Sequence, residues 1–225
     1  MVTEFQRARS ATAKQQREAD ILDAATRLGS SHGIRQVTLT DIAGAVGMHK
    51  SAMLRYFETR EQIFLRLTAA GWRDWAADLL GKLAGFEPGV VSDAAVAGVF
   101  TETLVARPML CDLLAQAPLN LERNVSLESV RAFKLVTLEE VDAIALEVER
   151  LLGLTREQSV DVIATATSLA GALWQMATPG PETEELYRSD PRLAHAIVEV
   201  GPRLTRVLTA LLAGFRAAGS GSVRP

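Results

Sequence analysis

Apolar residues recur at the three- and four-residue spacing of an α-helix through most of the chain. The first such segment has its apolar positions at Ile21, Leu22, Ala24, Ala25 and Leu28. It ends in the segment 29–33, whose glycines suit the end of a helix. A later helix is predicted from about Arg60, with apolar positions at Ile63, Phe64, Leu67, Trp72 and Trp75. No stretch shows the two-residue period of a β-strand, so the pattern predicts an all-α protein.

Two short helices are predicted between these segments, on either side of Gly47. Thr38 stands three residues before Asp41 and just ahead of the apolar Ile42, which is typical of a capping box at a helix start. Gly47 can adopt the left-handed conformation of a tight turn, and the second short helix begins near His49. Two short helices joined at a glycine predict a helix-turn-helix, whose second helix enters the major groove of DNA.

The rest of the chain is also predicted to be helical. The expected helices cover residues 93–106, 109–116, 127–152, 156–177 and 191–217, and a loop is expected over residues 81–92. One face of the 156–177 helix consists of small residues that permit close approach of another backbone, at Ala164, Ser168, Gly171 and Ala172. Pro202, which follows Gly201, is expected to kink or divide the last helix because proline removes a backbone donor.

Composition excludes several classes of protein. The 225 residues are 48% hydrophobic and 23% charged, as in ordinary globular proteins. One cysteine, Cys111, cannot close an intrachain disulfide, and the three histidines have no metal-binding spacing, so we expect no metal and no cofactor. Nucleophile, phosphate-loop and dinucleotide motifs are absent from the sequence, so we expect no enzyme. No signal-peptide or membrane-spanning pattern is present, which predicts a cytoplasmic protein without a membrane partner.

Charge is distributed unevenly along the chain. The formal net charge is -3, yet residues 1–60 contain nine basic and six acidic residues, a net charge of +3. The remaining 15 basic and 21 acidic residues give -6. This distribution indicates that the N-terminal part meets an anionic partner, although ordinary solvated surfaces would also explain a charge of this size.

Residues 18–65 resemble the DNA-binding domain of the tetracycline-repressor (TetR) family of transcriptional regulators. The resemblance rests on Gly33, the Val-Thr-Leu-Thr-Asp-Ile-Ala run at 37–43, Gly47, the Arg-Tyr-Phe run at 55–57 and residues 61–63. The acidic helical remainder resembles the ligand-binding and dimerisation half of that family. The resemblance implies a flexible arm (1–16), a three-helix helix-turn-helix domain (17–60), a larger helical effector-binding and dimerisation domain (61–218) and a disordered tail (219–225).

A DNA contact set follows from this resemblance. The base-reading residues are expected at the start of the second helix of the motif, at His49, Lys50 and Ser51. Phosphate contacts are expected from Thr38, Thr40, Arg55, Tyr56 and Arg60. Leu54 stands where the family usually has a tyrosine, and a leucine can only pack or touch a thymine methyl. Upstream, Arg7, Arg9 and Lys14 either reach the minor groove or belong to a solvated tail.

The resemblance also implies a small-molecule effector that binds between helices of the second half. Core packing alone explains most apolar residues there, so the choice of lining residues is open. The expected lining residues are Phe100, Leu104, Met109, Phe133, Thr137, Leu169, Trp174 and Gln175. No basic cluster in this half points to an acidic effector, which favours an uncharged or cationic apolar compound.

The function expected from these features is that of a homodimeric repressor. It would bind a palindromic operator in double-stranded DNA and would be released by a small-molecule effector. Two alternatives remain, a ligand-requiring activator and a helical carrier or interaction protein without DNA readout. The leucine at position 54 and the low charge of the N-terminal part favour the last of these.

Overall fold

The computed structural model describes the backbone of residues 2–221 and the side chains of residues 12–218, and every regular element in this part of the chain is helical. The elements are α1 (Val2–His32), η1 (Ile34–Gln36), α2 (Leu39–Ala45), α3 (Lys50–Met53), α4 (Arg60–Leu83), α5 (Asp93–Val105), α6 (Pro108–Gln116), η2 (Ala117–Leu121), η3 (Glu122–Asn124), α7 (Leu127–Leu152), α8 (Arg156–Ala177), α9 (Pro181–Ser189), η4 (Pro191–Ala196) and α10 (Val200–Gly221). The predicted all-α class is confirmed.

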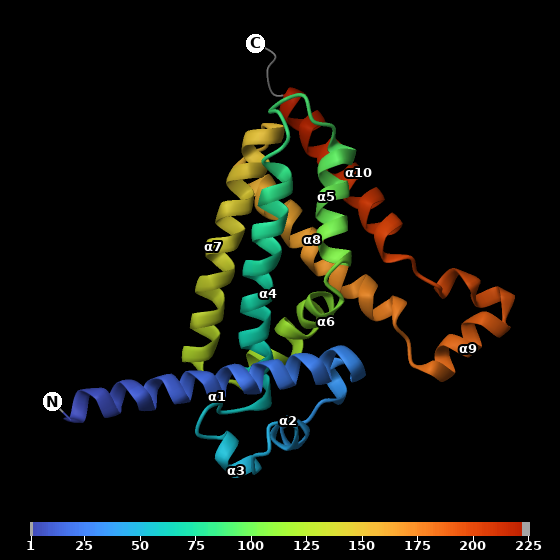
Figure 1. Cartoon of the computed structure of the whole chain (residues 1–225). Coiled ribbons are helices and arrows are strands. Elements are labelled where there is room, and N and C mark those ends of the chain that lie inside the picture. Colours follow the sequence, from blue (N-terminus) through green and yellow to red (C-terminus); the bar gives the residue numbers. More distant parts are fainter. Residues whose placement is uncertain (1, 222–225) are drawn as a thin grey trace.

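The helices form two parts, which we name the head (residues 2–59) and the body (residues 60–221). In Figure 1, α1 lies across the lower ends of α4 and α7, and α2 and α3 lie on the far side of α1 from the body. Helix α4 begins where the head ends and runs through the centre of the body, where it packs against α5, α6 and α7. Helix α8 packs against α6, α7 and α10.

Buried side chains join the head to the body. A single cluster includes Ile42 and Met53 in the head, Phe64 near the start of α4, and Trp75 and Phe100 in the body. The Trp75 indole N–H donates a 3.0 Å hydrogen bond to the hydroxyl of Thr103, which satisfies a polar group that burial would otherwise penalise. Burial of this continuous cluster fixes the direction in which α4 carries the head.

The predicted helix boundaries are confirmed for α7 and α8, agree within one residue for α5 and α6, and need correction elsewhere. The expected loop over 81–92 begins only after Leu83, where α4 ends. Residues 191–196 form the 3-10 helix η4, and the last α-helix begins at Val200. The expected 191–217 helix is therefore divided, as predicted, but the break lies at 197–199, ahead of Pro202. Pro202 lies in the first turn of α10, where its missing N–H costs nothing, so it does not kink that helix. Helix α9 was not predicted; it has no buried residue and projects from the body in Figure 1.

Both ends that were predicted to be flexible contain helical backbone. Helix α1 extends back to Val2, so residues 2–16, the predicted arm, form the first part of that helix. The side chains of Arg7 and Arg9 lie outside the described residues, and Lys14 pairs with Glu18 at 3.9 Å. Residues 219–221 belong to α10, and residues 222–225 lie outside the described part.

None of the described helices is by itself both long and apolar enough to cross a bilayer, and only the bent pair Asp93–Val105 and Pro108–Leu121 reaches the required length and composition together.

Candidate nucleic-acid interface

The start of α2 is formed by a reciprocal pair of hydrogen bonds. The Thr38 N–H and hydroxyl both donate to the Asp41 carboxylate, at 2.8 and 2.7 Å, and the Asp41 N–H donates back to the Thr38 hydroxyl at 3.2 Å. These bonds from Thr38 lower the pKa of Asp41. The predicted capping box is confirmed. The Thr38 hydroxyl is used inside the box, whereas the side chain of Thr40 beside it is exposed to solvent.

Gly47 forms the turn between α2 and α3. Its φ of 65° lies in the left-handed region, and the Met48 N–H behind it donates to the carbonyl of Ala43 at 2.9 Å. Ala43 is buried together with Met53 and Phe57, so both short helices share one core. This packing fixes the angle of α3 and leaves its opposite face to solvent.

Exposed polar side chains cluster around α3. His49, Lys50, Ser51 and Arg55 are exposed, and none of these side chains forms a hydrogen bond or ion pair with another residue of the described part. Leu54, which follows α3 directly, is 52% exposed in the same group. In Figure 1, α3 occupies the end of the head that points away from the body. The structure therefore brings five of the predicted DNA contacts together on one outward surface.

Arg60 is turned into the head instead. Its guanidinium donates to the backbone carbonyls of Ile34 and Val37, pairs with Glu61 at 2.9 Å and lies 4.8 Å from the centre of the Phe64 ring. Only 18% of its side chain is exposed. Arg60 therefore positions η1 against α4, and this internal role replaces its expected phosphate contact. Tyr56 is half-buried against the same core.

A cluster of polar groups joins the head to the start of α7. The Glu58 carboxylate accepts hydrogen bonds from the Ser126 N–H at 2.9 Å and from the Ser129 hydroxyl at 2.8 Å, and the Gln62 amide donates to Ser129 at 2.9 Å. The bond from the Ser126 amide, followed by that from Ser129, lowers the pKa of Glu58. The head is thus attached to the body at this point through a charged acceptor.

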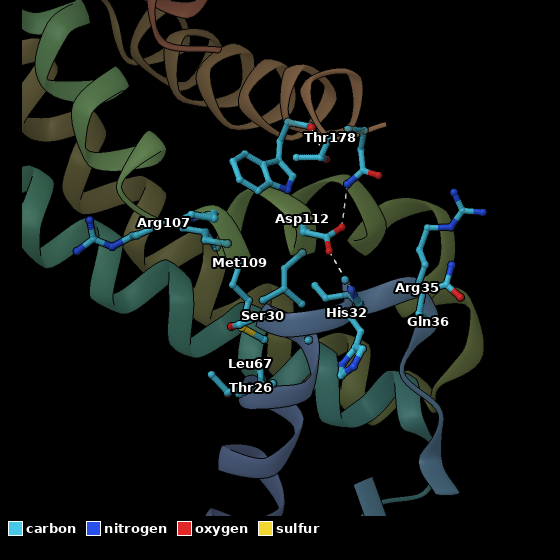
Figure 2. Close-up of a pocket in the computed structure, with 18 of the residues that line it drawn as sticks. Thr26, Ser30, His32, Arg35, Gln36, Leu67, Arg107, Met109, Asp112 and Thr178 are labelled. Atoms are coloured by element: carbon cyan, nitrogen blue, oxygen red, sulfur yellow. Dashed lines mark hydrogen bonds between the residues drawn. The ribbon is translucent and has the colours of Figure 1, made fainter. Parts of the chain in front are cut away.

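A second attachment uses Asp112 of α6. Its carboxylate accepts a 2.9 Å hydrogen bond from the Ile34 N–H in the head and a 2.8 Å bond from the Gln175 amide at the end of α8. Figure 2 shows Asp112 between these two elements, with both bonds drawn as dashed lines. We name this arrangement the Asp112 bridge. The sequence contains one indication of this bridge, because Asp112 is the one charged residue in the apolar segment 108–116.

The Asp112 bridge lines an open cavity of about 1000 Å³ between head and body, which we name the junction cavity. Its walls come from the end of α1, η1, the middle of α4, α6 and the end of α8. Met109, Trp174 and Gln175, three of the eight predicted effector residues, line it.

The other five predicted effector residues do not line the junction cavity. Phe100 and Leu104 are fully buried, and Phe100 packs edge-on against Trp75 with ring centres 6.1 Å apart. Phe133, Thr137 and Leu169 also lie away from it. Their prediction rested on apolar character, and an apolar side chain fills a core as readily as it lines a cavity. Within the described residues, no group of three or more His, Cys, Asp or Glu is placed to hold a metal ion.

Comparisons with known proteins match both parts of the chain. Residues 21–67 match the family model of bacterial regulatory proteins of the TetR family, and residues 69–219 match that of the tetracyclin repressor-like C-terminal domain. The comparison with curated proteins found no match.

Solved structures share the fold at low sequence identity. The fatty acid degradation regulator FadR of Bacillus halodurans is 14% identical with a TM-score of 0.55, and the match covers 88% of this chain and 96% of that one. A TetR-family regulatory protein from Rhodococcus RHA1 is 14% identical with a TM-score of 0.54, over 87% and 96%. The FadR repressor of Thermus thermophilus, solved with lauroyl-CoA, is 20% identical with a TM-score of 0.50, over 85% and 92%. Because the two family models together cover most of the chain, this protein belongs to the TetR family of transcriptional regulators.

Proposed function

We propose that the protein is a homodimeric repressor that binds a palindromic operator through α3 and leaves it when a small-molecule effector binds. The observation that supports this most directly is the outward surface around α3, where His49, Lys50, Ser51 and Arg55 have no partner within the described residues. Free donors and cations at the start of a recognition helix are the groups that reach base edges and phosphates.

Each side chain of this surface has a role in the proposal. Lys50, the first residue of α3, donates to guanine O6 or N7 in the major groove, and His49 and Ser51 beside it reach a base edge or a phosphate. Arg55 and Tyr56 follow the helix and contact the DNA backbone. Thr40 contributes its free hydroxyl to a phosphate, and Leu54 contacts a thymine methyl.

The proposed dimer uses α8 and α10 of each subunit in a four-helix interface. Ala164, Ser168 and Ala172 are exposed at intervals of four residues on α8, so a second helix can approach that face closely. Gly171 does not belong to this face, because it is buried against Ala115 of α6 in the same chain. A two-fold axis between the subunits places the two α3 helices about one DNA turn apart, roughly 34 Å, or a multiple of it.

TetR-family regulators bind DNA and small-molecule effectors and are generally not enzymes. We propose that this protein likewise binds DNA and an effector and catalyses no reaction. We also propose that it binds its operator in the cytoplasm. An effector that prefers the DNA-free arrangement of the heads lowers operator affinity by its differential binding energy, typically about 1–3 kcal/mol.

Selection of binding sites from random duplex DNA tests the proposal. We expect an inverted repeat, and an affinity for it that falls steeply with salt concentration. The double variant Lys50→Ala, Arg55→Ala should lose operator binding, whereas Arg131→Ala, an exposed arginine on α7, should retain it. Selection that recovers a site only in the presence of a ligand would overturn release by the ligand and favour the ligand-requiring alternative. If no sequence is enriched with or without a ligand, the remaining hypothesis is a carrier or interaction protein that does not read DNA.

A further inference from the structure

The junction cavity contains a carboxylate whose charge is not neutralised. Asp112 is half-buried, and its two hydrogen-bond donors, the Ile34 backbone amide and the Gln175 side-chain amide, are both neutral. No lysine, arginine or histidine of the described residues lies within ion-pair distance of it. An uncompensated charge of this kind is costly in a protein and favours a cation as its partner.

The other charged groups around the cavity do not supply that partner. Arg107 is committed to two carboxylates of α4, at 2.7 Å from Asp74 and 2.8 Å from Asp78. Arg35 is exposed at the edge, and Figure 2 shows its guanidinium directed away from Asp112. The His32 ring is bonded to the Ser31 hydroxyl at 2.8 Å. Among the charged side chains that line the cavity, Asp112 is therefore the carboxylate without a cationic partner in the described part of the chain.

The surfaces beside Asp112 are apolar and polarisable. The indole of Trp174 and the thioether of Met109 line the cavity together with Leu67 and Leu110. An aromatic face attracts an organic cation, and apolar walls favour one that carries hydrocarbon or ring substituents. At about 1000 Å³, the cavity has the size of pockets that accept drug-sized ligands.

We propose that the junction cavity binds a hydrophobic organic cation, with Asp112 as its counter-ion and Trp174 as its aromatic wall. The site lies between head and body, where the bound cation competes with the Ile34 amide for the Asp112 carboxylate. Occupancy of the site weakens the contact between η1 and α6, so the ligand changes the position of α3 relative to the body. This last step rests on the proposed function, whereas ligand binding itself does not.

Two ions of nearly identical size and opposite charge provide the test. Tetraphenylphosphonium and tetraphenylborate are titrated by calorimetry into the full-length protein and into its Asp112→Asn variant. Asparagine can keep a hydrogen bond to each partner of the Asp112 bridge. Its side-chain oxygen accepts from the Ile34 backbone N–H, and its side-chain NH2 donates to the side-chain oxygen of Gln175 when the Gln175 amide is turned over. The variant therefore removes the charge alone. Glu139→Gln, an exposed neutralisation on α7, is the matched control.

We expect the protein to bind the phosphonium ion saturably and to prefer it to the borate. Asp112→Asn should weaken phosphonium binding by about tenfold or more, and Glu139→Gln should leave it unchanged. Trp174→Leu should also weaken it while leaving the Asp112 bridge in place. Absence of phosphonium binding, equal binding by Asp112→Asn, or a preference for borate would each overturn the proposal, and the last result would identify an anionic ligand.

A second readout separates this inference from the proposed function. If an operator is selected, the phosphonium ion should lower operator affinity of the wild-type protein more than that of Asp112→Asn. If no operator is found, the proposed function fails and the calorimetric result still decides the ligand site. If the operator binds and the phosphonium ion does not, only the ligand site is overturned.

Discussion

The backbone N–H of Ser126, the residue before α7, donates a 2.9 Å hydrogen bond to the carboxylate of Glu58 in the head. A charged acceptor at the N-terminus of a long helix is favourable because the first amides of the helix have no internal partner. The same carboxylate accepts from Ser129, so one side chain of the head binds the first turn of a body helix at two points.

This contact predicts a loss of stability in acid. The pKa of Glu58 in the folded protein is below its ordinary value of 4.5, so the ionised form stabilises the fold fully above that value, and the contribution disappears as the pH falls through the lowered pKa. We expect Glu58→Gln to be less stable than the wild type near neutral pH, by less than about 1 kcal/mol because the group is exposed. The difference should shrink as the pH falls below 4.5 and close once the pH is below the lowered pKa of Glu58.

Thermal unfolding at a series of pH values measures this effect, with Glu139→Gln as the control for general loss of negative charge. A stability difference that does not change with pH would mean that the charge of Glu58 has no part in the contact.

Replacing Arg60 by alanine should lower the stability of the protein, whereas replacing Arg55 by alanine should weaken its binding to DNA. Arg60→Ala removes the guanidinium donor from the carbonyls of Ile34 and Val37 and should lower the free energy of unfolding by about 1–3 kcal/mol. Arg55→Ala should change the free energy of unfolding by no more than about 0.5 kcal/mol. It should lower the slope of log operator affinity against log salt concentration by the amount that one phosphate contact contributes. Chemical denaturation and operator affinity against salt concentration separate the two. Unchanged stability of Arg60→Ala would contradict its internal role.

Gly171 predicts a packing limit between α8 and α6. A Cβ at this position would lie 2.9 Å from the backbone nitrogen of Ala115 and 3.3 Å from the carbonyl oxygen of Cys111, so the two helices would have to separate. We expect Gly171→Ala to cost about 1–3 kcal/mol. Gly98→Ala on α5 has open space at its Cβ and should be neutral or stabilising by up to about 1 kcal/mol, since alanine favours a helix. Equal melting temperatures of the two variants would refute the close approach.

Cys111 should be unreactive in the folded protein. Burial, and to a smaller extent the nearby charge of Asp112, raise the pKa of its thiol from 9.0 to about 11, which reduces the thiolate by about a hundredfold. The thiol also donates to the Leu104 carbonyl at 3.3 Å. A disulfide reagent at mildly alkaline pH should react at once with the urea-unfolded protein and negligibly with the native one. Rapid native labelling would show that α6 opens readily.

Features that depend on neighbouring residues were predictable from the sequence. The capping box of Thr38 and Asp41, the turn at Gly47 and the extents of α7 and α8 all follow from patterns within a few residues or from regular spacing. The free surface around α3 follows equally, because the core positions Met53 and Phe57 determine which side of the helix faces solvent.

Features that depend on distant residues were not predictable in this way. Arg60 is drawn inward by carbonyls 23 and 26 residues earlier, and Asp112 meets the Ile34 amide across 78 residues. Helix periodicity places Phe100 and Leu104 on an inward face, yet it contains no information about whether that face meets side chains or a cavity. The predicted effector residues therefore include Phe100 and Leu104, which are buried in the core, as well as Met109, Trp174 and Gln175, which line the junction cavity.

The two attachments of the head have a consequence for building chimeric regulators. A graft that joins the head of this protein to a foreign body at the start of α4 would transfer Glu58 without its donor, the Ser126 N–H, and the Ile34 N–H without its acceptor, the Asp112 carboxylate. These partners lie 68 and 78 residues downstream. The transplanted head would then be joined to its new body by α4 and apolar packing alone. A working exchange must include α6 and the first turn of α7, so the unit of recombination in this protein is a set of contacts and not a continuous stretch of sequence.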